Sequence, residues 1–152
     1  SMKQRIALYK FICFTFFTVS IIACKKDKEE RSIIPEIRLV DVSPLQIKEY
    51  KDKIVFNLFY QDADGDIGEN NDAVKNLFIT DARNGITYQY RIKQLSPDGA
   101  EVSIEGNLMV ELNSTGILNG ASSEAVSYSI YLTDRAGNAS NTVVADGLMI
   151  IK

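Results

Sequence analysis

Three aspartates, Asp62, Asp64 and Asp66, alternate along a short stretch that also contains Gly65 and Gly68. Crowded carboxylates repel one another unless a cation or solvent relieves the repulsion. Ca²⁺ suits such a cluster because it accepts about six to eight oxygen ligands in a flexible geometry. The stretch therefore predicts one structural Ca²⁺ site. The alternative is a solvated acidic turn in which the aspartate side chains cap their own backbone.

The spacing of these acids is not that of an EF-hand. That loop requires Gly at its sixth position and Glu at its twelfth, where this chain has Ile67 and Ala73. The two acids of a glycosidase flank a cleft, whereas these three aspartates share one short stretch. The chain has no His, which excludes Ser-His-Asp and Cys-His catalysis and imidazole ligands. We therefore expect a protein that is not an enzyme.

Short β-strands must position these aspartates. After residue 33 the chain consists of apolar or alternating runs separated by turn residues, which is typical of strands. The expected strands cover residues 36–42, 54–60, 77–82, 86–92, 102–104, 108–112, 126–132 and 142–151. Asn84 and Gly85 predict a two-residue type I′ hairpin turn, because both of its positions need positive φ. The absence of an amphipathic helix pattern among these runs predicts an all-β, antiparallel β-sandwich over residues 33–152.

The same alternation sorts the tyrosines that are candidates for stacking on a ligand. It places Tyr88 and Tyr90 on the apolar face of their strand, where they pack into the core. Tyr131 lies opposite the apolar Ile130 and is expected to be exposed.

Two motifs resemble known families. Residues 133–143, TDRAGNASNTV, resemble the closing hairpin of bacterial immunoglobulin-like domains, D-x-A-G-N-x-S-N-T-V. Residues 62–68, DADGDIG, resemble the D-x-D-G-D-I/L-G loop of many Bacteroidota lipoproteins of this size. The resemblance implies an immunoglobulin-like β-sandwich of about seven to eight strands.

In such a fold the loop after the second strand and the loop between the last two strands emerge at the same end. That arrangement would bring Asp134 and Asn138 towards the three aspartates as further Ca²⁺ ligands. Glu69, Asn70 and Asp72 are additional oxygen-bearing candidates nearby.

Residues 1–23 have the features of a removable secretory signal peptide. Lys3, Arg5 and Lys10 precede an uncharged apolar run over residues 11–23, which is shorter than the roughly 20 residues of a membrane-spanning helix. Residues 20–24, SIIAC, resemble the lipobox of bacterial lipoproteins, which implies a covalent lipid on Cys24. The alternative is a plain thiol at the end of a signal peptide that is cut elsewhere.

Residues 24–32 form a charged stretch that reads as a flexible tether. It also resembles the signal by which Bacteroidota export lipoproteins to the outer face of the outer membrane. The alternative is a solvated linker without an address. We expect a lipid-anchored protein of the outer membrane, exposed at the cell surface.

The charge and cysteine content of the chain limit the partners and cross-links that are expected. The leader holds three of the 17 basic residues and none of the 20 acidic ones, which leaves a net charge of about −6 for the remainder. An acidic domain is a poor nucleic-acid binder, because phosphate contacts need clustered Lys and Arg. With Cys13 in the leader and Cys24 lipidated, no disulfide can form in the mature chain.

These observations predict a non-catalytic, lipid-anchored surface protein that is an accessory or structural subunit of an outer-membrane complex. Its expected partners are the membrane, through the lipid, and outer-membrane proteins. The alternative is a free-standing glycan- or protein-binding module, similar to an adhesin, on the cell surface.

Overall fold

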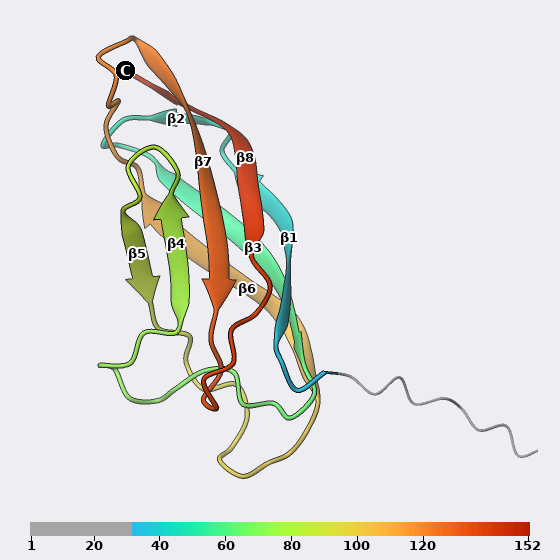
Figure 1. Ribbon diagram of the computed structural model, residues 1–152. Helices are drawn as coiled ribbons and strands as arrows, with labels where there is room; N and C mark the ends of the chain where they lie inside the picture. Colours follow the sequence, from blue (N-terminus) through green and yellow to red (C-terminus); the bar gives the residue numbers. More distant parts are fainter. Residues whose placement is uncertain (1–31) are drawn as a thin grey trace, which may run out of the picture.

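The computed structural model describes residues 32–152 (Figure 1). The predicted signal peptide, the lipidated Cys24 and the tether as far as residue 31 lie outside the described residues. Within residues 32–152 the chain is all-β and forms two sheets. This part of the chain has no helix that is long and apolar enough to cross a membrane.

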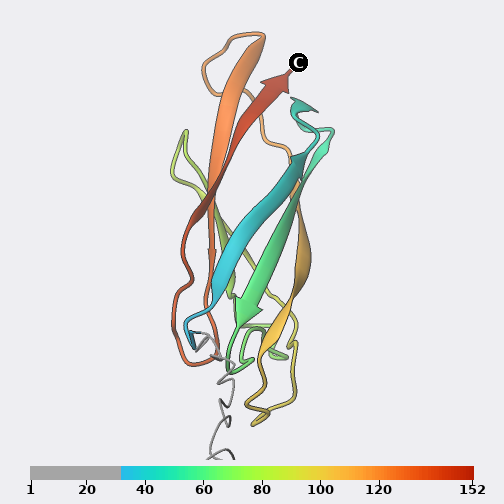
Figure 2. The same cartoon turned by 90° about the vertical axis from the view of Figure 1, so that its right-hand side faces the viewer.

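Eight strands form in the described part of the chain. They are β1 (Glu36–Ser43), β2 (Gln46–Lys48), β3 (Lys53–Asp62), β4 (Leu77–Asp81), β5 (Thr87–Tyr90), β6 (Ile104–Asn113), β7 (Ser123–Leu132) and β8 (Val143–Ile151). The smaller sheet has the order β1-β3-β6, and the larger sheet has the order β2-β8-β7-β4-β5. Figure 2 shows the long strands of both sheets running along the long axis of the molecule. The prediction of an all-β chain with seven or eight strands is confirmed. Two of the expected strands, 102–104 and 108–112, are however a single strand, β6, and β2 was not expected.

The core lies between the two sheets and follows from strand alternation. Every second residue of β3 from Ile54 onwards is buried, as is every second residue of β7 from Val126 onwards. Except for Asp62 at the end of β3, these side chains belong to one apolar cluster to which both sheets contribute. Phe56 of β3 meets Tyr128 of β7 edge to face, with ring centroids 5.6 Å apart and an interplanar angle of 78°. Burial of this apolar surface is the main force that holds the sheets together.

The tyrosine prediction holds for Tyr88 and Tyr90 but not for Tyr131, which was expected to be exposed. Tyr88 and Tyr90 pack against the core cluster. Tyr131 alternates with buried neighbours and is half-buried, because it stacks on Phe78 of β4 with ring centroids 4.8 Å apart.

The antiparallel prediction is wrong for one pair, because β2 lies parallel to the last part of β8. All other strand pairs of residues 32–152 are antiparallel. β1 ends at Ser43, and Pro44, which has no amide hydrogen, cannot continue its ladder. The chain then crosses to the larger sheet, where the Leu45 carbonyl accepts a hydrogen bond from the Met149 amide (2.8 Å). The three residues of β2 are too few to give a periodic pattern in the sequence.

The turn between β4 and β5 is longer than predicted. The Asp81 amide donates a hydrogen bond to the Ile86 carbonyl (2.9 Å), so four residues separate this closing pair. Gly85 has a φ of 73°, but φ of Asn84 is not positive, and the type I′ prediction is therefore wrong. The Asp81 carboxylate accepts hydrogen bonds from the backbone amide and the guanidinium of Arg83. These bonds draw the chain after β4 into the wider turn.

The side-chain amide of Asn141 joins the segment before β8 of the larger sheet to the edge strand β1 of the smaller sheet. The Ile37 amide of β1 donates to Oδ1 of Asn141 (2.8 Å), and Nδ2 of Asn141 donates to the Ile37 carbonyl (2.8 Å). Asn141, in the segment before β8, thus replaces a neighbouring strand residue for β1. The sequence motif contains Asn141 but gave it no role.

Candidate metal centre

The acidic loop, residues 62–68, begins inside β3. Alternation turns Asp62 inwards, so its side chain lies at the end of the core with only 2% of the residue exposed. Ile67 is fully buried and forms an isolated antiparallel bridge with Asp134. The burial of Ile67 and its bridge to Asp134 therefore help to fix the acidic loop against the turn between β7 and β8.

Two glycines let the acidic loop pass close to neighbouring backbone. Gly65 and Gly68 have φ values of 74° and 93°. A Cβ on Gly65 would lie 2.2 Å from the Val102 carbonyl oxygen, and one on Gly68 would lie 2.4 Å from the Lys93 carbonyl oxygen. Side chains larger than hydrogen do not fit at these distances, and the left-handed backbone also favours glycine. The expectation that both glycines allow tight, left-handed turns is confirmed.

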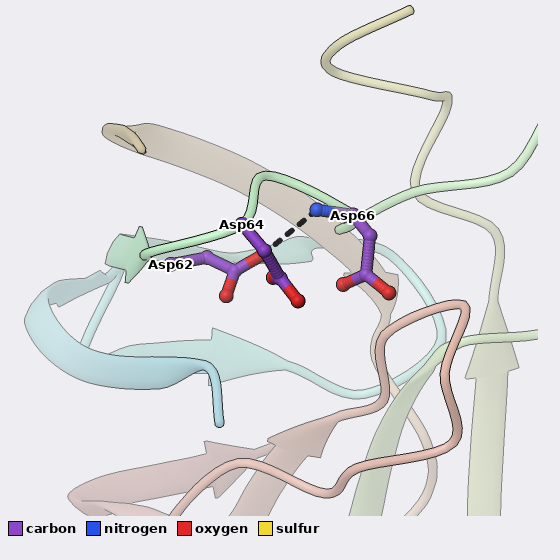
Figure 3. A group of neighbouring side chains, drawn as sticks. All are labelled: Asp62, Asp64 and Asp66. Atoms are coloured by element: carbon purple, nitrogen blue, oxygen red, sulfur yellow. Dashed lines mark hydrogen bonds between the residues drawn. The ribbon is translucent and has the colours of Figure 1, made fainter. Parts of the chain in front are cut away.

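The three aspartates project their carboxylates to the same side of the acidic loop (Figure 3). One carboxylate oxygen from each lies within 4.8 Å of the others. Backbone amides orient two of the groups, because the Asp66 amide donates to Asp62 Oδ2 (2.9 Å) and the Ala136 amide donates to Asp66 Oδ2 (3.0 Å). The Oδ1 atoms of Asp62, Asp64 and Asp66 are all buried without a hydrogen-bond partner.

This arrangement fits a calcium ion. Two oxygens that each lie about 2.4 Å from one Ca²⁺ are at most about 4.8 Å apart, and the three aspartates meet that limit. A buried acceptor without a donor costs free energy, which a cation in the donor's place would recover. Carboxylate oxygens are hard ligands, which Ca²⁺ prefers. Three carboxylates supply part of its shell of about six to eight oxygens, and backbone carbonyls or water would supply the rest.

Without a cation, the carboxyl groups of Asp62 and Asp66 resist ionisation. Burial, followed by the charge of Asp64, raises the pKa of Asp62 to about 6 from its ordinary value of 3.8. Burial and the charges of Asp134 and Asp64 also raise the pKa of Asp66. A divalent cation would reverse this penalty by stabilising the charged forms.

Asp134 and Asn138 lie at the same end of the molecule as the acidic loop. Besides the bridge to Ile67, the Arg135 amide donates a hydrogen bond to the Asp66 carbonyl (3.2 Å). The Asp134 carboxylate accepts two hydrogen bonds from Asn138, from the backbone amide (2.7 Å) and from the side-chain amide (2.8 Å). The expected meeting of the two loops is thus observed, but Asp134 closes its own turn. The group of three oxygens within 4.8 Å does not include it.

The three additional candidates for metal ligands, Glu69, Asn70 and Asp72, form contacts with other residues. Oε1 of Glu69 accepts hydrogen bonds from the amides of the next two residues. The Asn70 side chain donates to Oε1 of Gln94 (2.5 Å), and Asp72 forms an ion pair with Arg91 (2.7 Å). These contacts shape the turn that follows the acidic loop.

Two residues that support the acidic loop gave no signal in the sequence. The Ser96 hydroxyl donates a hydrogen bond to the Gly65 carbonyl, although the two residues are 31 positions apart. Ala136 contributes only its backbone amide, to Asp66. Almost every residue type has a backbone amide, so a backbone donor cannot be recognised from the sequence. The D-x-A-G-N motif includes Ala136 but does not indicate this hydrogen bond.

Comparison of the chain with protein-family models, curated proteins and solved structures found no match. The resemblance to bacterial immunoglobulin-like domains and to Bacteroidota lipoproteins stays a prediction.

Proposed function

We propose that the described β-structure is an immunoglobulin-like sandwich that holds one structural Ca²⁺ between Asp62, Asp64 and Asp66. The proposal rests on the convergence of three aspartates, of which one carboxylate oxygen each lies within 4.8 Å of the others. The Oδ1 atom of each aspartate is also buried without a hydrogen-bond partner. Two sheets that contribute to a single core support the sandwich architecture.

The geometry favours a structural cation over a pair of catalytic acids. The two carboxyl groups of a glycosidase flank the bond that is cleaved. The three aspartates instead share one short loop, and Asp62 is buried at the end of the core. We therefore propose a protein without catalytic activity.

A bound Ca²⁺ would supply two positive charges, which offset most of the negative charge of the three carboxylates. Asp62 belongs to β3 of the smaller sheet, whereas Asp66 is hydrogen-bonded to Ala136 in a turn of the larger sheet. One ion held by both aspartates would therefore tie the two sheets together at this end of the molecule. Its role would be to stabilise the loops.

The wider role that we propose is a lipid-anchored accessory or structural subunit of an outer-membrane complex at the cell surface. The lipobox-like residues 20–24, the charged residues 25–31 and the two family motifs support this role. The alternative role, a free-standing glycan- or protein-binding module, is favoured by the stacked pair of Phe78 and Tyr131. Both rings alternate with core residues of the larger sheet, and aromatic rings on a sheet face are suitable for stacking.

Urea unfolding of the full chain, in EDTA and in millimolar Ca²⁺, tests the metal site. Calcium at about 100 times its Kd should stabilise the folded state by about 2.7 kcal/mol. Asp64→Asn should reduce this gain, whereas Asp146→Asn, an exposed residue of β8 with the same change of charge, should retain it. A midpoint that calcium leaves unchanged would contradict the proposal.

Affinity purification from native membranes in mild detergent tests the wider role. A C-terminal tag keeps the added sequence away from Cys24. Stoichiometric recovery of an outer-membrane protein, identified by mass spectrometry, is expected for a subunit. Recovery of the chain alone would favour the free-standing module.

A further inference from the structure

The chain contains two Asn–Gly pairs, Asn84–Gly85 and Asn119–Gly120. Asparagine is modified most readily in this dipeptide, because glycine has no side chain to hinder a reaction between its nitrogen and the neighbouring side chain. Both pairs are exposed; the first lies between β4 and β5, and the second lies between β6 and β7. They are therefore candidate sites of spontaneous covalent modification.

The reaction is an attack of the glycine nitrogen on the side chain of the preceding asparagine. The glycine nitrogen loses its proton and forms a bond to Cγ of the asparagine, and the side-chain nitrogen takes up a proton and leaves as ammonia. The product is a succinimide ring. Water then opens the ring at either carbonyl, which gives aspartate or, with the main chain passing through Cγ, isoaspartate. The first step requires a glycine amide that is free to lose its proton.

The two pairs have closely matched local geometry. The φ of Gly85 is 73° and that of Gly120 is 74°, and a Cβ on either glycine would have no neighbour within 4 Å. In both pairs Oδ1 of the asparagine accepts a hydrogen bond of 2.9 Å from the amide two residues further on, in Ile86 and in Ala121. Exposure, glycine φ and the hydrogen bond of the asparagine side chain therefore do not distinguish the two pairs.

The two pairs differ in what the glycine amide contacts. The Gly85 amide donates a hydrogen bond to the Asp81 carbonyl (2.8 Å), in the turn that Arg83 stabilises. The Gly120 amide lies outside every strand and donates to no atom of residues 32–152. A hydrogen-bonded amide must open before it can lose its proton. The Gly120 amide is free to react without such an opening.

We propose that Asn119 is a site of spontaneous deamidation and that the turn between β4 and β5 protects Asn84 from the same reaction. The nucleophile is the backbone nitrogen of Gly120, the electrophile is Cγ of Asn119, and water completes the reaction. The proposal does not depend on the calcium site, because no residue of the acidic loop takes part in it.

Deamidation of Asn119 changes a loop at the pole of the molecule where the chain ends (Figure 1). There the Lys152 amide donates a hydrogen bond to the Ser122 carbonyl (3.3 Å). Either product adds one negative charge to this loop. Isoaspartate also lengthens the main chain by one carbon, directly after Leu118, whose amide donates to Oε2 of Glu124 (2.7 Å). Aged protein therefore differs from new protein in the charge and the path of the loop between β6 and β7.

Peptide mass spectrometry of aged protein tests the proposal. The purified full chain is incubated at mildly alkaline pH, and the deamidated fraction is followed separately in the peptides that contain Asn84 and Asn119. Asn119 should deamidate about fivefold faster, because Gly85 must first break a hydrogen bond of ordinary net strength. Asn119→Gln, an exposed position whose longer side chain closes a ring more slowly, should remove most of the ammonia that the folded chain releases.

A denatured sample separates the effect of the fold from that of the flanking residues. In guanidinium chloride the hydrogen bond of Gly85 is lost, so the two asparagines should deamidate at equal rates. Equal rates in the folded chain, or a faster reaction at Asn84, would overturn the proposal. It would also be overturned if the difference persisted in guanidinium chloride, or if Asn119 reacted only there.

Discussion

Replacing the buried aspartate of the acidic loop should stabilise the calcium-free protein. Burial and the charge of Asp64 raise the pKa of Asp62 to about 6, so ionisation is harder in the folded state than in the unfolded state. The stability that belongs to the protonated group is complete below about pH 3.8 and is lost as the pH rises to about 6. Asp62→Asn removes the ionisation and keeps an oxygen that can accept the Asp66 amide hydrogen bond.

The magnitude follows from the pKa. A change from 3.8 to about 6 is about two units, and each unit corresponds to about 1.36 kcal/mol. At pH 7 in EDTA, Asp62→Asn should therefore be up to about 3 kcal/mol more stable than the original chain. Near pH 4 the two proteins should have equal stability. In millimolar Ca²⁺ the order should reverse, because the variant has lost a charged ligand.

Urea unfolding monitored by tyrosine fluorescence, at pH 4 and pH 7, with EDTA or with Ca²⁺, gives the four comparisons. Asp146→Asn, on the exposed part of β8, is the control and should change the free energy of unfolding by less than about 0.5 kcal/mol. A variant less stable than the original chain at pH 7 in EDTA would refute the argument. It would mean that the Asp62 carboxylate is stabilised, and not penalised, by its surroundings.

Three further substitutions test contacts that position the loops. Gly65→Ala places a Cβ 2.2 Å from the Val102 carbonyl oxygen and should cost about 2–4 kcal/mol in urea unfolding, whereas Gly99→Ala, with a similar φ but open space around it, should cost about 1 kcal/mol. Asn141→Ala leaves both backbone groups of Ile37 without their partners and should cost about 2 kcal/mol; hydrogen exchange of the Ile37 amide should accelerate, and the exposed Thr142→Ala should leave it slow. Arg83→Met leaves Asp81 and Glu124 without their shared, buried cation and should cost about 3–5 kcal/mol. Lys53→Met, which breaks an exposed ion pair with Glu111, should cost less than about 1 kcal/mol, and equal costs for these two variants would contradict the role assigned to burial.

Strict alternation made the long strands predictable. In β3 and β7 the apolar residues recur at every second position, and the predicted strands agree with the observed ones to within about three residues at each end. β2 was missed because its position depends on a parallel pairing with β8, about 100 residues further along the chain. The β4–β5 turn was misjudged because a side-chain hydrogen bond from Arg83 to Asp81 overrides the local preference of Asn84 and Gly85.

The three aspartates of the acidic loop were found because their residue type and spacing are local properties of the sequence. Their support was not predictable, because it consists of backbone amides and of Ser96, which lies far along the chain. The same limit applies to the buried cluster of Arg83, Asp81 and Glu124, in which Arg83 and Glu124 are 41 residues apart. Hydrogen bonds between distant residues leave no periodic trace in a sequence.

The two ends of the described chain lie at opposite poles of the molecule (Figure 1). Ser32 is hydrogen-bonded beside the acidic loop, through the Ala63 amide, and Lys152 follows β8 at the other pole. A force that pulls these ends apart would slide β1 along β3 and β8 along β7. Seven residue pairs join each of these two couples of strands, so their hydrogen bonds would share the load and would have to break together. Strand pairs loaded in this way would resist tension between Ser32 and Lys152, because no single hydrogen bond would break first.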